Sequence, residues 1–222
     1  MINDRSKEPF VFPRWTNLLR PLVAAGGVGG LLYVGVIVTF GFSPETTDAG
    51  YMPEQPVPYS HALHVGELGL DCRYCHTTVE SAARAAIPPT QTCMNCHKMI
   101  RSESEKLIPV LSSYATGMPV EWVRVHDLPD YAYFDHSAHV RNGVGCVSCH
   151  GRVDTMEEIY QVASLSMGWC LECHRDPTPN LRPLEAVTSM DWASDEDPET
   201  LGRRLAEMYN VEPSTDCTTC HR

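Results

Sequence analysis

An uncharged apolar run lies near the amino terminus. Leu22–Phe42 is 21 residues long and carries no charged side chain, and about 20 such residues suffice for a helix to cross a bilayer. Basic residues precede the run, whereas Glu45 and Asp48 follow it, so the positive-inside bias predicts a cytoplasmic amino terminus and an outer location for the rest. We expect an uncleaved anchor, because the run is too long for a signal peptide and no A-x-A site follows it.

The chain then divides into segments of different composition. Gly50–Pro58 contains three prolines and is typical of an extended linker. The predicted organisation is a cytoplasmic segment at residues 1–20, an anchor helix at 21–42, a linker at 43–58 and an outer domain at 59–222. Within the anchor, Gly26 to Gly30 reads G-x-x-x-G, and packing against another subunit or ordinary membrane-helix composition would both explain it.

Short amphipathic patterns predict a few helices in the outer domain. A capping box at Thr77–Glu80 predicts a helix through Ala86, and Asp197-Pro198-Glu199 is a good helix start. Two further helices are expected, one capped by Ser102 with the stripe Leu107, Leu111 and Tyr114, and one capped by Asp154 or Thr155 that carries Met156, Ile159 and Ala163. From Val120 to Tyr133 the chain is expected to be extended, because prolines interrupt helical patterns there.

Five C-x-x-C-H motifs carry the candidate chemistry. They run from Cys72 to His76, Cys93 to His97, Cys146 to His150, Cys170 to His174 and Cys217 to His221, with second cysteines at Cys75, Cys96, Cys149, Cys173 and Cys220. This motif is the signature of c-type haem attachment. Two thiols bind the two vinyl groups of one porphyrin, and the adjacent histidine reaches the iron from one face.

The numbers of cysteines and histidines match this interpretation. All ten cysteines lie in the motifs, and five of the ten histidines are motif ligands. The remaining five are His61, His64, His126, His136 and His139, which is the number needed if every iron has a histidine on both faces. Zinc sites and a disulfide framework are the alternative interpretations. Neither requires a histidine directly after the second cysteine five times.

Four of these histidines occur as H-x-x-H pairs just before a motif. His136 and His139 precede Cys146, and His61 and His64 precede Cys72. Residues three apart lie on one side of a helical turn, so each pair can serve two different irons. His126 stands alone and is the fifth candidate. Met156 and Met167 are reserve distal ligands, although core methionines would have the same pattern.

The size and charge of the outer part restrict its fold and partners. Residues 43–222 number 180, or 36 for each haem, too few to enclose each porphyrin separately. We therefore expect a mostly irregular fold with short α-helices, built around five haems. This part carries 13 basic and 26 acidic residues, a net charge of −13, which excludes nucleic acid as a partner and suits a partner with a basic patch.

The predicted iron ligands indicate electron transfer. Two imidazoles on every iron leave no position for a substrate, so we expect no catalytic residue in this chain. A haem-based reductase would keep one iron open, for instance by replacing one motif histidine, but all five motifs end in histidine. Bis-histidine ligation also implies lower potentials than ligation by histidine and methionine.

Longer segments carry a family resemblance. F-P-R-W-T-N at Phe12, W-V-R-V-H-D-L-P-D-Y at Trp122, F-D-H-S-A-H-V at Phe134, C-V-S-C-H-G-R-V-D at Cys146 and S-M-G-W-C-L-E-C-H-R at Ser166 together resemble the pentahaem cytochrome c subunits of bacterial alternative complex III, the ActA family. The H-x-x-H and C-x-x-C-H motifs alone resemble the broader cytochrome c3 and c7 class.

The resemblance implies a function and a set of partners. Such a chain would carry electrons from a quinol-oxidising complex in the bacterial cytoplasmic membrane to a periplasmic cytochrome c or copper protein. The implied partners are an iron-sulfur subunit related to molybdopterin oxidoreductases, multi-spanning quinol-oxidising subunits and a monohaem cytochrome c subunit. By analogy with cytochrome c3, His61 would serve the haem at Cys72 and His136 the haem at Cys146, with His64 and His139 reaching other haems. A self-sufficient, membrane-anchored quinol dehydrogenase remains an alternative.

Overall fold

The computed structural model describes residues 12–41 and 47–221, in two compact units, Met1–Thr46 and Thr47–Arg222. The charged residues that preceded the anchor at Arg5 and Lys7, and Glu45 after it, lie outside the described residues. Each unit is described by itself.

The described part of the first unit is a single long helical segment. The 3-10 helix η2 (Arg14–Leu18) continues into α1 (Leu19–Gly41). Its apolar side chains are exposed, and the segment is long and apolar enough to cross a membrane. Nothing lies within 4 Å of a Cβ added at Gly26 or Gly30. The helix is therefore compatible with a single-pass anchor whose glycine face has no neighbour among the described residues of its own unit.

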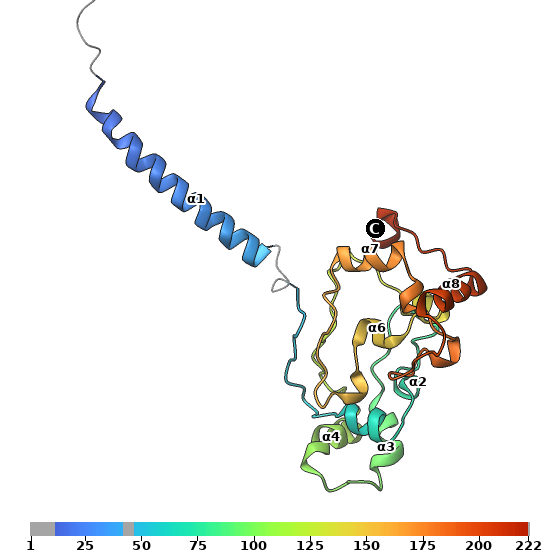
Figure 1. Cartoon of the computed structure of the whole chain (residues 1–222). Helices are drawn as coiled ribbons and strands as arrows, with labels where there is room; N and C mark the ends of the chain where they lie inside the picture. Colours follow the sequence, from blue (N-terminus) through green and yellow to red (C-terminus); the bar gives the residue numbers. More distant parts are fainter. Residues whose placement is uncertain (1–11, 42–46, 222) are drawn as a thin grey trace, which may run out of the picture. The chain divides into compact units, whose positions relative to one another are not determined.

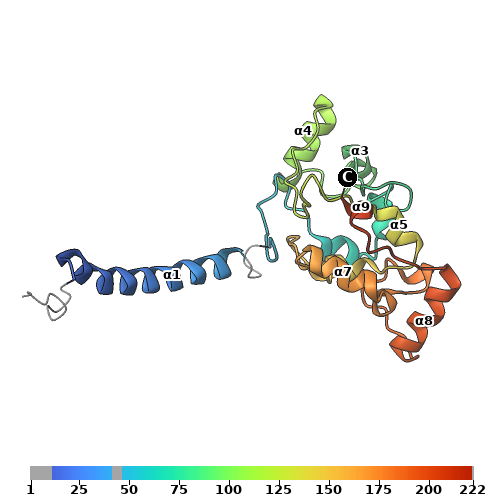
Figure 2. The same ribbon diagram turned by 90° about the horizontal axis from the view of Figure 1, so that it is seen from above.

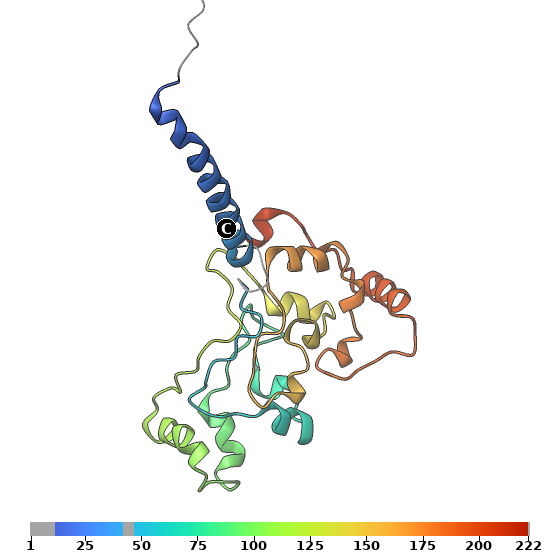
Figure 3. The ribbon, with the colours of Figure 1, turned by 60° about the vertical axis from the view of Figure 1, so that its left-hand side comes forward.

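The second unit consists of short helices joined by long irregular segments (Figures 1, 2 and 3). Its α-helices are α2 (Cys72–Cys75), α3 (Thr90–His97), α4 (Ile108–Thr116), α5 (His136–Arg141), α6 (Cys146–His150), α7 (Met167–Arg175), α8 (Pro198–Tyr209) and α9 (Cys217–Cys220). One π-helical turn, η4 (Ala62–Glu67), and the 3-10 turns η5 (Glu105–Leu107), η6 (Val153–Thr155), η7 (Thr178–Asn180) and η8 (Leu184–Ala186) complete it. Residues 47–221 contain no strand, only an isolated bridge between Val144 and Leu181. The expectation of short helices in a mostly irregular chain is confirmed.

The segment predicted as a linker is extended but bonded to the second unit. Gly50 N–H donates to the Gln161 carbonyl at 2.7 Å, and Gln161 N–H donates to the Tyr51 carbonyl at 3.0 Å. The Gln55 side chain both donates to and accepts from the backbone of Val123, at 2.9 and 3.0 Å. Because backbone groups of residues 50–55 are bound in this way, residues 47–58 belong to the second unit and are not a free linker.

Two of the predicted helices in the second unit form. Asp197 caps α8 by accepting a hydrogen bond from Thr200 N–H, and Leu201 and Leu205 are buried. The helix α4 carries Leu111, which packs against an apolar cluster that includes Leu107, the last residue of η5. It is preceded by the turn η5 with Ser104 at its N-cap and no side-chain cap, so the cap predicted at Ser102 is wrong.

The other two predicted helices are absent because long-range hydrogen bonds use their backbone groups. After Thr77, the Thr78 hydroxyl accepts from Ala86 N–H and holds a loop. Ala83 accepts a hydrogen bond from His136 N–H. After Thr155, the Met156 carbonyl accepts from Ala62 N–H. The bonds to His136 and Ala62 connect these segments to distant parts of the unit, and their own short-range bonds form turns instead of a helix.

The apolar core is divided into small clusters. Four groups of three or four buried residues are separated from one another, for example Val79 with Val140 and Val187, and Leu181 with Leu201 and Leu205. A single continuous side-chain core is usual for a domain of this size. The small clusters agree with the expectation that large apolar cofactors fill much of the interior.

Candidate haem-binding sites

Each of the five motifs forms a short helical turn. The turns are α2, α3, α6, α7 and α9, and none of the ten cysteines forms a disulfide. Residues three apart on a helix lie on one side, so both thiols of each motif point toward the same neighbouring space. This arrangement fits a cofactor attached at two points.

Local capping fixes two of these turns. The Asp71 carboxylate accepts from Arg73 N–H at 2.8 Å at the start of α2, and Ser166 Oγ accepts from Trp169 N–H at 3.3 Å at the start of α7. The guanidinium of Arg73, which donates to Asp71, holds the pKa of that carboxyl well below its usual range, at about 2. The charged cap is thus ionised at any physiological pH.

The two H-x-x-H segments repeat one geometry. Tyr59 packs edge-on against His61 (centroids 4.8 Å, 84°) and stacks on His64 (4.4 Å, 21°). Phe134 packs in the same way against His136 (4.8 Å, 84°) and lies over His139 (4.4 Å, 32°). An aromatic ring two residues before each pair therefore contacts both imidazoles at different angles, and two imidazoles held in this way can face different motifs.

Three of the H-x-x-H histidines each face a motif histidine, and the three distances between ring centroids are nearly equal. Ring centroids are 6.2 Å apart for His64 and His97, 6.3 Å for His136 and His150, and 6.1 Å for His139 and His174. A metal–imidazole bond is about 2 Å long and the ring centre lies about 1 Å beyond the nitrogen, so two rings on opposite sides of one iron have centroids about 6 Å apart. The three pairs have the spacing of axial ligands.

The fourth H-x-x-H histidine lies near the first motif. Burial, followed by the nearby His76 and His64 rings, lowers the pKa of His61 to about 4. A lowered pKa keeps the ring neutral, the form that binds iron.

Hydrogen bonds at Nδ1 orient most of the imidazoles. His64, His76, His97, His136, His139, His174 and His221 each pair Nδ1 with a backbone carbonyl, over 2.7 to 3.1 Å. With Nδ1–H donating to an oxygen, Nε2 carries the lone pair. This second-shell bond is usual for metal-ligating histidines, so these side chains fit the proposed role.

His126 and the motif histidine His221 are not part of the three facing pairs of imidazoles. The ring of His126 is 4.5 Å from that of His150, at 72°, and its Nε2 is buried without a hydrogen-bond partner. His221 Nδ1 bonds to the Tyr131 carbonyl at 3.1 Å, and the Tyr131 ring is 5.9 Å away. In residues 47–221, none of the five non-motif histidines makes a ring contact with His221.

The two reserve methionines lie in different environments. Met156 is buried in a cluster with Val153 and Met190, against which Cys72 and Cys146 pack. Met167 begins α7 and is 66% exposed. Met156 is thus core packing beside the first and third motifs, and Met167 has a free side chain one turn before Cys170.

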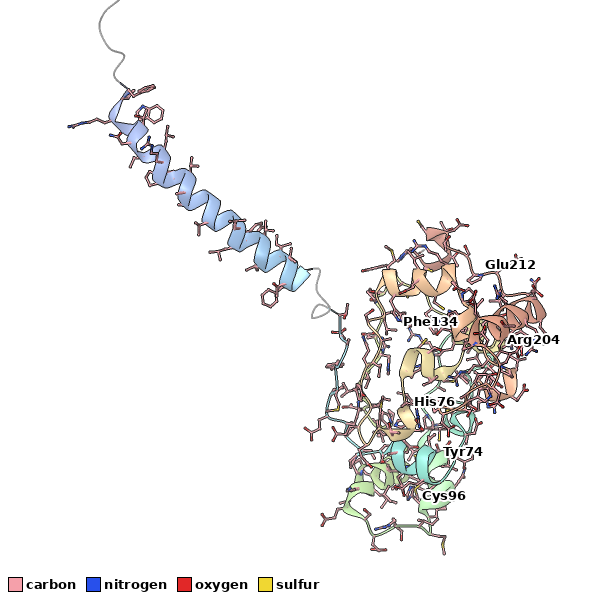
Figure 4. All side chains as sticks on the ribbon, in the orientation of Figure 1. Tyr74, His76, Cys96, Phe134, Arg204 and Glu212 are labelled. Carbon is pink, nitrogen blue, oxygen red and sulfur yellow. The ribbon has the colours of Figure 1, made fainter. Side chains whose placement is uncertain are left out.

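Contacts between thiols place the first three motifs side by side. Burial raises the pKa of the Cys75 thiol, and the nearby Cys93 thiol raises it further. Asn95 also donates to the Tyr74 hydroxyl at 3.1 Å. In Figure 4, Tyr74, His76 and Cys96 lie in one part of the domain. Cys72 and Cys146 pack against the same cluster of Val153, Met156 and Met190, so the first motif lies between the second and the third.

The remaining motifs continue this row. Burial raises the pKa of Cys149 to about 11, and the nearby Cys173 and Cys170 thiols add to the shift. Burial also raises the pKa of Cys170, with Cys220 as the next cause. The spatial order is therefore second, first, third, fourth and fifth motif, and Figure 1 shows α3, α2, α6 and α7 following one another in that order.

Sequence analysis did not identify the aromatic residues or the spatial order. The repeated pattern aromatic-x-H-x-x-H at Tyr59 and Phe134 was available as a signal for the first. Nothing in the motif spacing signals the second, because the order depends on contacts between distant residues.

Comparison with known proteins supports a cytochrome relationship. Residues 132–222 match the family described as "Cytochrome c7 and related cytochrome c". A stretch of 132 residues, 57% of the chain, is 33% identical to the "Menaquinone reductase, multiheme cytochrome c subunit" of Nitratidesulfovibrio vulgaris (strain Hildenborough). The alignment spans 60% of that relative's length. The chain is therefore similar to multihaem c-type cytochromes, a class that implies covalently bound haem c.

Proposed function

We propose that this chain is an electron-transfer subunit that holds five haems c and has no catalytic site of its own. The observation that carries the proposal is the single row of five motifs, in which three motif histidines face a second imidazole at 6.1 to 6.3 Å. A row of closely spaced redox centres with both axial positions occupied suits electron transfer and excludes substrate binding at those irons.

The chain's own residues have defined roles in this proposal. The paired cysteines of each motif attach one haem, and the motif histidine binds its iron from one face. His61, His64, His136 and His139 bind the opposite faces at the first four motifs. Backbone carbonyls at Nδ1 hold the rings of His64, His136 and His139 in place, whereas Nδ1 of His61 is buried without a hydrogen-bond partner. Each haem supplies a one-electron couple whose potential the two imidazoles keep low.

The proposed setting is a quinol-oxidising complex in a bacterial cytoplasmic membrane, of the alternative complex III type. The helix α1 would anchor the chain, with the haem unit on the periplasmic side. An iron-sulfur subunit, multi-spanning subunits and a monohaem cytochrome c would accompany it, and a soluble cytochrome c or copper protein would accept electrons. The named relative, itself a subunit of a menaquinone reductase, supports membership in a membrane quinone complex.

The relative's name also favours a second candidate, in which electrons flow toward menaquinone. The same row of sites would carry electrons in either direction, because a row of irons with two imidazoles has no intrinsic polarity. The direction would then depend on the potentials of the partners at its two ends.

Stopped-flow spectroscopy of the complex purified from membranes tests these proposals. With menaquinol, we expect the haems of the complex to be reduced and those of the isolated chain to stay oxidised. Quinol oxidation by the isolated chain would instead establish a self-sufficient dehydrogenase. Adding menaquinone to the reduced complex examines the second candidate, which requires that haem oxidation be faster than haem reduction by menaquinol.

A further inference from the structure

The residue before the first cysteine differs in charge from motif to motif. Asp71 and Asp216 occupy this position at the first and fifth motifs, where they are the N-caps of α2 and α9. At the third motif the position is Gly145, the N-cap of α6. The side chain of Arg182 lies against this glycine, so the third motif has a cation in the place where two other motifs have a carboxylate.

The contact between Arg182 and Gly145 requires a residue without a side chain. A Cβ added at Gly145 would lie 2.5 Å from Nε and 2.7 Å from Cδ of Arg182, closer than real Cβ atoms come. Burial lowers the pKa of Arg182, and the nearby Cys146 thiol acts against this shift. Because Gly145 directly precedes Cys146, the guanidinium lies beside one of the two thiols expected to attach the third haem.

Backbone and side-chain contacts both hold Arg182 in this position. Its backbone N–H donates to the Gly143 carbonyl at 2.8 Å. Nη1 donates to the Ser189 carbonyl at 2.6 Å, and the guanidinium carbon lies 5.4 Å from the centre of the Trp192 ring. The charged group is therefore fixed by this chain's own residues, whether or not a haem is attached.

The charge of Arg182 is not neutralised by a carboxylate. Five other arginines in residues 47–221 form ion pairs with aspartate or glutamate. The partners of the Arg182 side chain in that range are neutral, a carbonyl and an indole. The residue is half-buried, and a charge in such a place is screened less by water and salt than an exposed one. An arginine keeps its proton even there, so Arg182 is a fixed, unpaired positive charge.

We propose that Arg182 tunes the haem at the third motif, where its positive charge raises the reduction potential. Reduction adds one electron to the ferric haem and lowers its net charge by one, so a nearby cation stabilises the reduced form. This inference rests on the proposed attachment of a haem at Cys146 and Cys149. Since the third motif is the middle site of the row, the charge makes an electron more stable at the centre of the row and opposes the effect of two imidazoles.

Potentiometric titration of the full haem-loaded chain tests the proposal. Arg182→Gln should move one of the five haem transitions to lower potential and leave the other four nearly in place. Five unchanged transitions would overturn the inference.

The His136→Ala background identifies the haem that shifts. The haem opposite His150 is expected to be high-spin there, so its reduction can be followed at its own absorption band. Adding Arg182→Gln should lower the potential of this high-spin haem. A shift confined to the low-spin haems would contradict the assignment of Arg182 to the third motif.

Two variants separate charge from contacts. Arg182→Lys keeps the positive charge but loses the planar group that lies over Trp192, and it should keep most of the potential. A shift as large as that of Arg182→Gln would show that the contacts and not the charge set the potential. Arg141→Gln, the matched control, removes an exposed arginine and should leave all five transitions in place. Equal shifts in the two glutamine variants would attribute the effect to the net charge of the chain and refute a local role.

Gly145→Ala keeps the proposal testable if Arg182→Gln does not take up all its haems. The new Cβ forces the guanidinium away from Gly145, so the third haem should shift in the same direction by a smaller amount, and no shift would overturn the inference. Intact mass separates this failure from failure of the proposed function. Fewer than five haems on the unmodified chain would contradict the function, whereas five haems whose potentials do not respond to Arg182 would contradict this inference alone.

Discussion

His136 and His150 face each other with ring planes 11° apart and centroids 6.3 Å apart. A hydrogen bond from Nδ1 of His136 to the Ala83 carbonyl, at 2.9 Å, fixes one of the two rings. Burial, followed by the neighbouring His126 ring, lowers the pKa of His150 to about 3. The ring of His136 is therefore oriented, and that of His150 neutral, before any iron binds, which reduces the cost of ordering the pair on binding.

Removing His136 should open one iron. We expect His136→Ala to convert one low-spin haem to a high-spin form that binds carbon monoxide, because the opposite imidazole is lost while Cys146, Cys149 and His150 keep the haem attached. Arg141→Ala, on the same helix α5 but exposed, is the control and should leave the spectrum unchanged. An unaltered spectrum in His136→Ala would show that another side chain binds that iron.

Intact mass should reveal the number of attached haems. The polypeptide is 24.7 kDa, and the protein matured in a host with a cytochrome c assembly system should exceed it by five haems. Replacing Cys93 and Cys96 by serine should remove one haem, because both thioether bonds at that site are lost. A protein without haem, or with a divalent metal at its thiols, would contradict the assignment of all five motifs.

Two aspartate caps should have equal effects on stability and different effects on the haems. Asp135 accepts from Ser137 N–H and Ala138 N–H at the start of α5, and Asp197 caps α8 in the same manner. Replacing either by alanine should lower the free energy of unfolding by a similar, small amount, because each variant loses one helix cap. Only Asp135→Ala should broaden the low-spin haem signals, because α5 carries two proposed ligands. Equal spectra in both variants would show that the cap does not position His136 and His139.

Acid should destabilise the fold through its buried histidines. The pKa of His61 falls from 6.5 to about 4 on folding, mainly because of burial. Between these pH values the unfolded chain binds a proton that the folded chain does not, so stability is complete above about pH 6.5 and decreases as pH falls toward 4. Chemical denaturation across this range measures the slope, which His61→Gln should reduce. A slope that is unchanged in His61→Gln would assign the acid sensitivity to other groups.

The outline of the fold could be predicted because it depends on residues that are close together in the sequence. The apolar run of α1, the proline-initiated helix α8 with its Asp197 cap, and the scarcity of regular structure all follow from composition and short patterns. The helices predicted after Thr77 and Thr155 are absent because long-range contacts decide the structure there. Their backbone groups bond to residues far away in the sequence, such as His136 and Ala62, and a capping pattern carries no information about such partners.

The sequence by itself determined which residues can attach and bind haem, because C-x-x-C-H is a constraint within five consecutive residues and one helical turn. Tertiary structure alone decided that His64 faces His97, that His139 faces His174, and that the second motif precedes the first in the spatial row. These relationships depend on how irregular segments cross one another. They are fixed by long-range hydrogen bonds and by the aromatic rings of Tyr59 and Phe134, and spacing along the chain does not encode them.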